Sequence, residues 1–556
     1  MPKVYDCIVV GSGASGGWAA KELTERGLEV LMLEAGRAIE PLKDFHINPW
    51  PYESKYRGFL APKEAEIYDP VVNEYTKHLF VNTKEHPYTT PPGKPYAWPR
   101  VKALGGRSLV WGRGVPRFSD LNFKAASRDG YGVDWPISYK DIEPYYDKVE
   151  TTIGVTGMDI GLWHAPTGKY MKSIPLNCGE LLLKKGCQKL GVTLVQFPTA
   201  VITENHDGRP KCHYCGSSQC GRGCDIGSMF NSIYVTLPKA RATKRFTLRT
   251  DAMVREVLVD ENGKPKGVLF VDRVTKKTYE AYARVIVLAA SSLETARILL
   301  NSTSRFHPNG LGNSSGVLGK YLHEHIMAGS ITGFAPQLYN APVRNEDGKP
   351  CGFYIPRFRN VDAKHPGYIR GFQYSGSSGA RIFPGFAKGL GNLFGTSLKS
   401  EIRKLYPAVV SMTGFGEVLP RETNYVEIDK EVKDPWGIPV LRIHQDWSDN
   451  ELKMVQDIAD SAEELFRAAG FEILSVNRTP LMPGSSIHEI GTARMGADAK
   501  TSVLNPFCQS HDVKNLFLVD GSCFVSGGNQ NTTLTILALC TRACEYLAEE
   551  FKKGNL

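Results

Sequence analysis

The N-terminal segment alternates between short apolar runs and a glycine-rich turn, a pattern that predicts a β-α-β unit. Val4–Val10 is short and mostly apolar, as expected for a strand buried on both faces of a parallel sheet. Residues 18–26 have the pattern of a helix that ends at Gly27, and residues 28–33 form a second apolar run. We therefore predict a strand, a helix and a second strand in that order.

Similar runs recur further along the chain and extend the predicted α/β fold. Residues 284–290 are apolar and end in small side chains, and residues 293–300 have a helical pattern, so we predict a later parallel strand followed by a helix. Residues 532–551 predict an amphipathic helix with Asn531 at its N-cap. Residues 370–376 and 424–428 predict strands of a second domain.

The loop between the first strand and helix has the spacing of a dinucleotide-binding turn. Gly11 permits a tight turn, Gly13 allows a pyrophosphate to approach the backbone, and Gly16 allows the helix to pack on the strand. Glu34 stands 23 residues after Gly11, at the end of the second strand, where a ribose hydroxyl needs an acceptor. An isolated Gly-x-Gly-x-x-Gly motif is weak evidence, but this order of elements favours a dinucleotide site over a plain β-α-β turn.

Composition limits the remaining possibilities. A chain of 556 residues exceeds one ordinary core and predicts two domains. The net charge of +9 is spread along the chain without a Lys/Arg run, which excludes a nucleic-acid partner. No apolar run approaches the ~18 residues of a membrane span, so we expect no direct membrane insertion. A first strand at Val4 leaves no room for a signal peptide.

Four of the twelve cysteines lie close together: Cys212, Cys215, Cys220 and Cys224. Interleaved glycines would let a short loop wrap these thiolates around one centre. A disulfide knot is one interpretation, although nothing else indicates a secreted, disulfide-built fold. Structural zinc is a second, although zinc prefers two separated Cys-x-x-Cys pairs. We favour an iron–sulfur cluster.

Four segments resemble the glucose–methanol–choline oxidoreductases. They are the N-terminal glycine loop, residues 105–118, residues 135–146, and the block from His488 to the C-terminal helix. The second resembles the flavin-covering segment of pyranose 2-oxidase-like members. The resemblance implies an α/β fold with a Rossmann-like FAD-binding domain interleaved with an α+β substrate domain (the GMC fold). We expect residues 1–40, 95–120, 210–320 and 480–556 in the FAD domain, and 41–94, 121–209 and 321–479 in the substrate domain.

The resemblance also implies which residues contact FAD. These are Gly11, Gly13, Ser15, Gly16, Glu34, Gly105, Gly106, Ser108, Trp111, Val254, Asp520 and Gly521. Some members attach FAD covalently through a His just before the Trp of the flavin-covering segment. Val110 occupies that position here, so we expect noncovalent FAD.

The same resemblance assigns the catalytic pair to His488 and Asn531. His488 lies three residues before Gly491 of a Gly-Thr pair, and Asn531 lies eleven residues after Asp520 of an Asp-Gly-Ser segment. His488 would take the substrate hydroxyl proton as a hydride leaves for the flavin, and Asn531 would orient the substrate oxygen. His511 and His444 are alternatives outside the motif.

The cysteine loop resembles that of a bacterial subgroup, the FAD-dependent glucose, gluconate and glucoside 3-dehydrogenase subunits. It implies a [3Fe-4S] cluster, with Cys215, Cys220 and Cys224 matching best, and a dehydrogenase acting at C3 of a glucopyranoside or C1 of glucose. It further implies a small partner subunit, a cytochrome or other electron acceptor, and a periplasmic location through the co-exported partner, or else a cytoplasmic one. The alternatives are an oxidase with structural cysteines and a noncatalytic FAD-binding protein.

Overall fold

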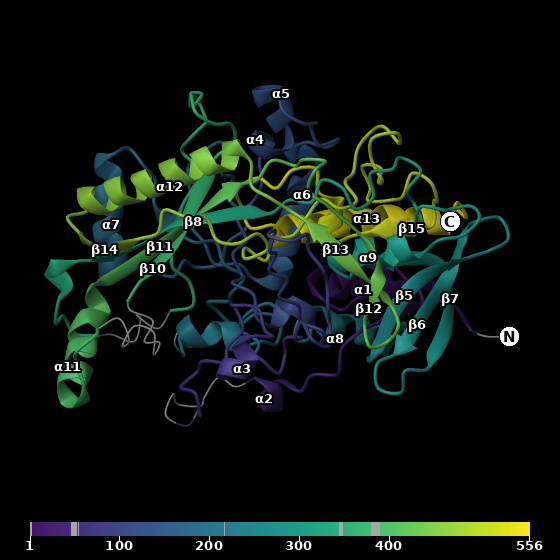
Figure 1. The fold of residues 1–556 in the computed structure, drawn as a ribbon, viewed down its shortest axis with the longest axis horizontal. Helices are drawn as coiled ribbons and strands as arrows, with labels where there is room; N and C mark the ends of the chain where they lie inside the picture. Colours follow the sequence, from purple (N-terminus) through teal and green to yellow (C-terminus); the bar gives the residue numbers. More distant parts are fainter. Residues whose placement is uncertain (1–2, 46–52, 54, 216, 344–348, 380–389) are drawn as a thin grey trace.

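A computed structural model describes residues 3–45, 53, 55–215, 217–343, 349–379 and 390–556. Two sheets lie at opposite ends of the molecule, and both chain termini lie at the end that holds the seven-stranded sheet (Figure 1). Residues 66–119 form long loops with one short helical turn, η1 (Gly106–Leu109). No described helix is long and apolar enough to cross a membrane.

The first sheet has a parallel core and an antiparallel extension. Its parallel strands are β4 (Phe246–Arg249), β2 (Val30–Leu33), β1 (Val4–Val10), β7 (Thr278–Leu288) and β15 (Leu516–Leu518). Val10 of β1 is level with Leu33 of β2 and Leu288 of β7, so the carboxyl ends of three strands meet at one edge. The antiparallel strand β6 (Pro265–Asp272) pairs with the first half of β7, and β5 (Ala252–Val259) pairs with the other edge of β6. The predicted strand at 284–290 is confirmed as part of β7. The strand begins earlier, at Thr278, because its exposed first half pairs with β6.

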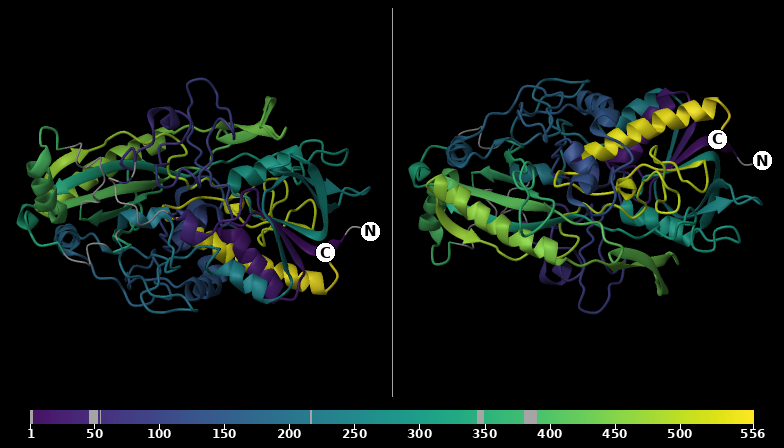
Figure 2. Two further views of the ribbon diagram at one scale, coloured as in Figure 1. Left: turned by 90° about the horizontal axis from the view of Figure 1, so that it is seen from below. Right: turned by 90° about the horizontal axis from the view of Figure 1, so that it is seen from above.

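Helices from distant parts of the chain pack together beside this sheet. They are α1 (Ala14–Glu25), α6 (Tyr139–Ile153), α8 (Thr236–Ala242) and α13 (Thr533–Lys552). Figure 2 shows α1, α8 and α13 side by side. Trp18 and Leu23 of α1 are completely buried in this layer. The predicted helices at 18–26 and 532–551 are confirmed, and α1 starts earlier because the glycine loop itself forms its first turn.

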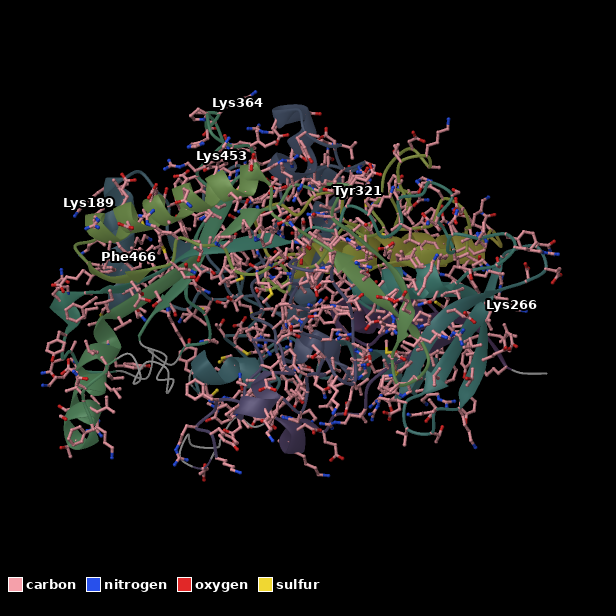
Figure 3. The ribbon with its side chains drawn as sticks, in the orientation of Figure 1. Lys189, Lys266, Tyr321, Lys364, Lys453 and Phe466 are labelled. Atoms are coloured by element: carbon pink, nitrogen blue, oxygen red, sulfur yellow. The ribbon has the colours of Figure 1, made fainter. Side chains whose placement is uncertain are left out.

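The second sheet is antiparallel and six-stranded, in the order β14-β8-β11-β10-β9-β3. Its strands are β14 (Glu472–Val476), β8 (His325–Phe334), β11 (Val409–Glu417), β10 (Phe372–Ser378), β9 (Phe353–Ile355) and β3 (Val195–Gln196). Helices α12 (Asp449–Ala468) and α7 (Cys178–Lys189) cover one face of this sheet. In Figure 3, Phe466 of α12 lies on the sheet side of the helix, where it is completely buried, and Lys453 is on the exposed side.

The predicted strand at 370–376 is β10, in the second sheet. The one at 424–428 is the start of β12 (Tyr425–Lys433), which instead forms a separate hairpin with β13 (Pro439–His444). This hairpin packs on α9 (Ser292–Asn301) through Leu293, Val426 and Leu441. The domain boundaries themselves stay a prediction. The other α-helices in the described part of the chain are α2 (Pro41–Asp44), α3 (Pro62–Ala65), α4 (Asp120–Phe123), α5 (Ala125–Asp129) and α11 (Gly395–Leu405).

Candidate active site

The turn between β1 and α1 is built so closely that two of its positions exclude any side chain. Gly11 has φ +95°, and a Cβ there would lie 2.5 Å from the carbonyl oxygen of Ala289 at the end of β7. A Cβ at Gly16 would lie 2.0 Å from the carbonyl oxygen of Gly11. At Gly13, by contrast, a Cβ would meet no atom within 4 Å, because this residue faces the open cavity described below. The turn therefore presents its backbone to a ligand at the start of α1.

Glu34 closes the other side of this turn. One carboxylate oxygen accepts hydrogen bonds from the backbone N–H (3.0 Å) and the hydroxyl (2.5 Å) of Ser12, and the other accepts from the N–H of Gly36 (2.7 Å). Burial raises the pKa of Glu34. Ser12 also accepts a hydrogen bond from the N–H of Gly105, and thereby joins the glycine loop to the segment that carries Trp111. Ser12 belongs to the recognised motif, but its role as a link was not predicted.

A cavity of about 1100 Å³ runs from this turn to the C-terminal block. It is larger than a typical small-ligand pocket of ~300–1,000 Å³, as a dinucleotide and a substrate together require. All of the predicted cofactor-binding residues line it except Gly16 and Gly105: Gly11, Gly13, Ser15, Glu34, Gly106, Ser108, Trp111, Val254, Asp520 and Gly521. Gly16 instead packs against the turn, and Gly105 takes the left-handed φ of +99° that positions Gly106 beside Gly13.

Three buried cations on the cavity wall surround one carboxylate, and the sequence did not single them out. Lys102, Arg297 and Arg100 lie 3.2, 3.5 and 3.8 Å from the carboxylate oxygens of Glu294. Arg297 also pairs with Asp434 at 2.8 Å. Three cations against two carboxylates leave this part of the wall positively charged, which suits an anionic ligand.

His488 and Asn531 both line the same cavity and touch each other. The Nδ2 of Asn531 is 3.3 Å from the Nε2 of His488, and the Oδ1 of Asn531 is buried without a hydrogen-bond partner among the described residues. Neither alternative histidine lines the cavity: His444 stacks on Tyr425 and contacts Glu427, and His511 contacts Ser502. The structure therefore brings together the pair that the motif predicted.

The predicted N-cap role of Asn531 is wrong. Helix α13 begins at Thr533, its N-cap is Thr532, and no side chain caps it. The amide of Asn531 faces His488 instead. Thr532, Thr533 and Ile536 line the cavity, so the N-terminal end of α13, with its positive dipole, still points toward the ligand.

A second histidine, His325, lies behind His488 and was missed by the sequence analysis. Its Nδ1 is 2.8 Å from the Nδ1 of His488, and its Nε2 is 3.1 Å from the carbonyl oxygen of Gly528. The two rings meet edge to face, at 85° with centroids 4.9 Å apart. His325 is the first residue of β8 and belongs to no local motif, so only the tertiary fold reveals it.

Burial keeps this histidine pair uncharged. Burial lowers the pKa of His488 well below its usual value, and the neighbouring His325 and Arg107 lower it further. Burial lowers the pKa of His325 to about 4. Two neutral imidazoles at neutral pH can accept a proton but cannot repel each other as cations.

The loop before His488 is held by two buried carboxylates. Glu324 accepts hydrogen bonds from the N–H of Gly484, the hydroxyl of Ser486 and the amide of Gln445, and burial raises its pKa to about 7. Arg107 of the flavin-covering segment donates to both oxygens of Glu489, at 3.1 and 2.7 Å. These contacts fix the backbone on both sides of the histidine.

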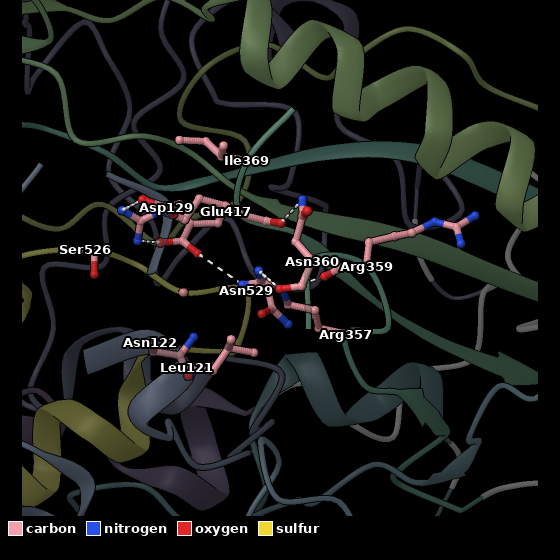
Figure 4. Close-up of polar contacts among 12 residues, drawn as sticks. Leu121, Asn122, Asp129, Arg357, Arg359, Asn360, Ile369, Glu417, Ser526 and Asn529 are labelled. Atoms are coloured by element: carbon pink, nitrogen blue, oxygen red, sulfur yellow. Dashed lines mark hydrogen bonds and ion pairs between the residues drawn. The ribbon is translucent and has the colours of Figure 1, made fainter. Parts of the chain in front are cut away.

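A buried polar cluster supports the loop that carries Asn531 from its other side (Figure 4). Arg370 bridges Asp129 (2.7 Å) and Glu417 (3.2 Å), and Asn529 lies beside this group with both side-chain polar atoms lacking a described partner. Gln373 of β10, a central strand of the second sheet, is only 1% exposed.

The four clustered cysteines line one small cavity of about 20 Å³, together with His213. Burial raises the pKa of Cys212 to about 11 and that of Cys220 to about 12. Among the described residues no disulfide forms, and no group of three or more His, Cys, Asp or Glu side chains is placed to hold a metal ion. The four thiols therefore line one cavity, but their sulfur atoms do not have the geometry of a metal-binding site.

Arg113 connects this loop to the flavin-covering segment. Its guanidinium is 1% exposed and donates to the carbonyl oxygens of Trp111 (2.5 Å), Leu109 (2.9 Å) and Cys220 (3.0 Å). Burial lowers the pKa of Arg113, whereas its electrostatic interactions with Cys220 and Cys224 act in the opposite direction and raise it. Gly221 and Arg222 of the cysteine loop also line the large cavity. The two cavities are therefore neighbours.

Comparison with known proteins agrees with this geometry. The N-terminal and C-terminal models of the GMC oxidoreductase family match residues 5–327 and 420–540. The 2-methyl-1,2-propanediol dehydrogenase of Mycolicibacterium austroafricanum is 30% identical over 98% of this chain and 95% of its own length. The fructose dehydrogenase large subunit of Gluconobacter japonicus is 27% identical over 99% and 98%. The solved structure of Aspergillus oryzae formate oxidase superposes with a TM-score of 0.65 at 15% identity, covering 99% of both chains.

Proposed function

Because this chain belongs to the GMC oxidoreductase family, whose members oxidise CH–OH groups with FAD, we propose that it is a sugar or glycoside dehydrogenase. The preferred reaction is oxidation at C3 of a glucopyranoside or at C1 of glucose. Three full-length relatives are named dehydrogenases, of a diol, of fructose and of gluconate, which supports a hydroxylated substrate and an acceptor other than oxygen, whereas two others are named oxidases.

The residues present fit FAD. The glycine turn and the start of α1 would hold the pyrophosphate, Glu34 would accept from the ribose, and Trp111 and the start of α13 would border the isoalloxazine. When bound, FAD supplies the hydride acceptor at its N5. Val110 precedes Trp111 where other members have a linking His, so we propose noncovalent binding, which release of all yellow colour on acid precipitation would support.

The observation that carries the proposed reaction is the contact between His488 and Asn531 at the wall of the cofactor cavity. A neutral imidazole there can take the hydroxyl proton of the substrate while the hydride leaves. The amide of Asn531 can donate a hydrogen bond to the same substrate oxygen and hold it in line.

Replacing His488 with Ala tests this assignment. Loss of a general base costs about 10²- to 10⁴-fold, so we expect the rate constant of flavin reduction by substrate to fall by that factor. The measurement is anaerobic stopped-flow absorbance at saturating substrate. FAD content should stay unchanged, and His444→Ala is the matched control outside the cavity. Near-normal reduction in the His488 variant would disprove the proposed role.

We further propose that the cysteine loop holds an iron–sulfur cluster. The support is the shared cavity of four thiols, its position beside the flavin-covering segment, and a buried Arg113 whose described hydrogen bonds go to carbonyl oxygens. A buried cation needs a compensating negative charge, which metal-bound thiolates would provide. When bound, such a cluster supplies one-electron transfer. Such a cluster would pass electrons from the flavin to a partner subunit and a cytochrome. The name of the relative from Gluconobacter japonicus, a large subunit, is consistent with an assembly of this kind.

Metal analysis and low-temperature EPR of anaerobically purified protein test the cluster. We expect iron in excess over flavin and an EPR signal in the oxidised protein, both lost in the Cys220→Ser variant. Cys178→Ser is the control, since Cys178 is exposed and lies on α7, outside the loop. Zinc, or no metal in either protein, would refute the cluster and favour an oxidase with structural cysteines.

A further inference from the structure

A continuous row of hydrogen bonds runs from the backbone of one loop, through two imidazoles, to the cavity. The carbonyl oxygen of Gly528 is 3.1 Å from Nε2 of His325, whose Nδ1 is 2.8 Å from Nδ1 of His488. The Nε2 of His488 is 3.3 Å from the amide of Asn531. Every ring nitrogen in the row thus has one partner.

The fixed ends of the row determine where its protons lie. A carbonyl oxygen can only accept, so the Nε2 of His325 must carry a proton and donate it to Gly528. A neutral imidazole has one N–H, so the Nδ1 of His325 is an acceptor. The Nδ1 of His488 must then be the donor, and its own single proton is used there.

We propose that His325 is a positioning residue that fixes His488 as the tautomer protonated on Nδ1, so that its bare Nε2 faces the cavity as the base. This inference rests on the proposed function, in which His488 takes the hydroxyl proton. The opposite tautomer would point an N–H at the substrate hydroxyl and at the N–H of Asn531, and it would place two bare nitrogens 2.8 Å apart. Such a His488 could not accept a proton.

The surroundings of His325 support this assignment. His325 is 1% exposed, and burial keeps it neutral by lowering its pKa to about 4. It begins β8, where it lies opposite Glu417 of β11, so its backbone is held by the second sheet. Its acceptor, Gly528, lies three residues before Asn531 in the same loop. The side chain of His325 therefore orients His488 and also anchors the loop that carries Asn531.

Two variants of His325 separate the hydrogen bond from simple packing. In His325→Asn the amide oxygen can take the place of Nδ1 and still accept from His488, whereas the bond to Gly528 is lost. In His325→Gln the amide nitrogen can take the place of Nε2 and still donate to Gly528, whereas no acceptor remains for His488. We expect the Gln variant to reduce FAD about 10- to 100-fold more slowly at saturating substrate, and the Asn variant to keep most of the rate.

A merely structural role would affect both variants in the same way or would reduce their FAD content. Equal losses in the two variants, or a normal rate in the Gln variant, would overturn the proposal. Failure of the proposed function is distinguishable, because it would appear as a normal rate in His488→Ala whatever the His325 variants do.

A direct measurement on the unmodified enzyme does not depend on how the variants fold. Nitrogen NMR of FAD-loaded protein labelled with ¹⁵N-histidine distinguishes protonated from bare ring nitrogens, and the His488 signals are those missing from His488→Ala. We expect a proton on Nδ1 and none on Nε2. A proton on Nε2 would refute the assignment.

Discussion

A single imidazole, that of His488, combines burial with two directed polar neighbours. Partial burial lowers the pKa of the ring and favours its neutral form, and the contacts with His325 and Asn531 determine which nitrogen is available. A histidine in water would be partly protonated near its ordinary pKa of ~6.5 and would lose its function as a base there. The protein thus has a base that remains available in mildly acidic solution.

The pH dependence of flavin reduction follows from these depressed pKa values. Because the pKa of His488 lies well below 6.5, the neutral form persists as the pH falls through 6.5, and the rate constant should show no inflection there. We expect the rate to fall only at lower pH, when the histidine pair gains a proton. Anaerobic stopped-flow reduction from pH 5 to 8 measures this. A midpoint near 6.5 would mean that His488 is hydrated in the working enzyme.

At the scale of elements, two glycines of the β1–α1 turn have different roles, one in packing and one in ligand access. Gly16 is needed by the protein itself, since its α-hydrogen faces the carbonyl of Gly11, whereas Gly13 faces only the cavity. The packing of α1 on β1 therefore depends on one glycine, and access of the ligand to the backbone depends on another.

Substituting Ala at each position should separate these uses. Gly16→Ala forces a shift of backbone and should destabilise the apoprotein by at least about 1–3 kcal/mol, as overpacking does. Gly13→Ala should leave the apparent Tm of the apoprotein unchanged but weaken FAD binding about tenfold or more. Thermal unfolding with and without FAD, together with FAD titration, provides both values. A normal apoprotein Tm for Gly16→Ala would contradict the packing argument.

At the scale of the whole molecule, helices α1, α6 and α13 bring together segments that are far apart in sequence, and one buried carboxylate links α1 to α6. Glu22 of α1 is 0% exposed and pairs with Lys21, Arg26 and Lys148, the last from α6. Burial opposes ionisation of Glu22, but the three cations prevail and lower its pKa. Its stabilising contribution is therefore present above the ordinary pKa of Glu and is lost as pH falls through the depressed value.

Removing this charge should loosen the helical layer. Glu22→Gln removes the counter-charge that Lys21, Arg26 and Lys148 share, although Lys21 keeps Glu25 at 2.8 Å, and should cost about 1.5–3 kcal/mol. Lys148→Ala, which removes a partly exposed partner, should cost less than about 1 kcal/mol. Urea unfolding followed by tryptophan fluorescence compares the two. Equal effects would show that the layer does not depend on Glu22.

The parts of the fold and of the candidate site that depend on local contacts could be predicted from the sequence, whereas those that depend on distant contacts could not. Val4–Val10, the glycine turn and Glu34 follow from local pattern, because strand, turn and helix signals lie next to one another in the sequence. His488 and Asn531 followed from a family motif. His325 could not be predicted, because it meets His488 only through the register of β8 beside a distant loop. The burial of Gln373 likewise depends on its strand being central in the sheet.

The order in which the cavity walls occur along the chain has a consequence for biosynthesis. The glycine turn leaves the ribosome early, whereas His488, Asp520 and the start of α13 are translated far later. A nascent chain therefore exposes half of a nucleotide site, with the apolar face of α1 uncovered, until its partner α13 emerges. The FAD site is therefore complete only after α13 has been translated, and chaperones that shield α1 until then should raise the yield of active enzyme in expression hosts.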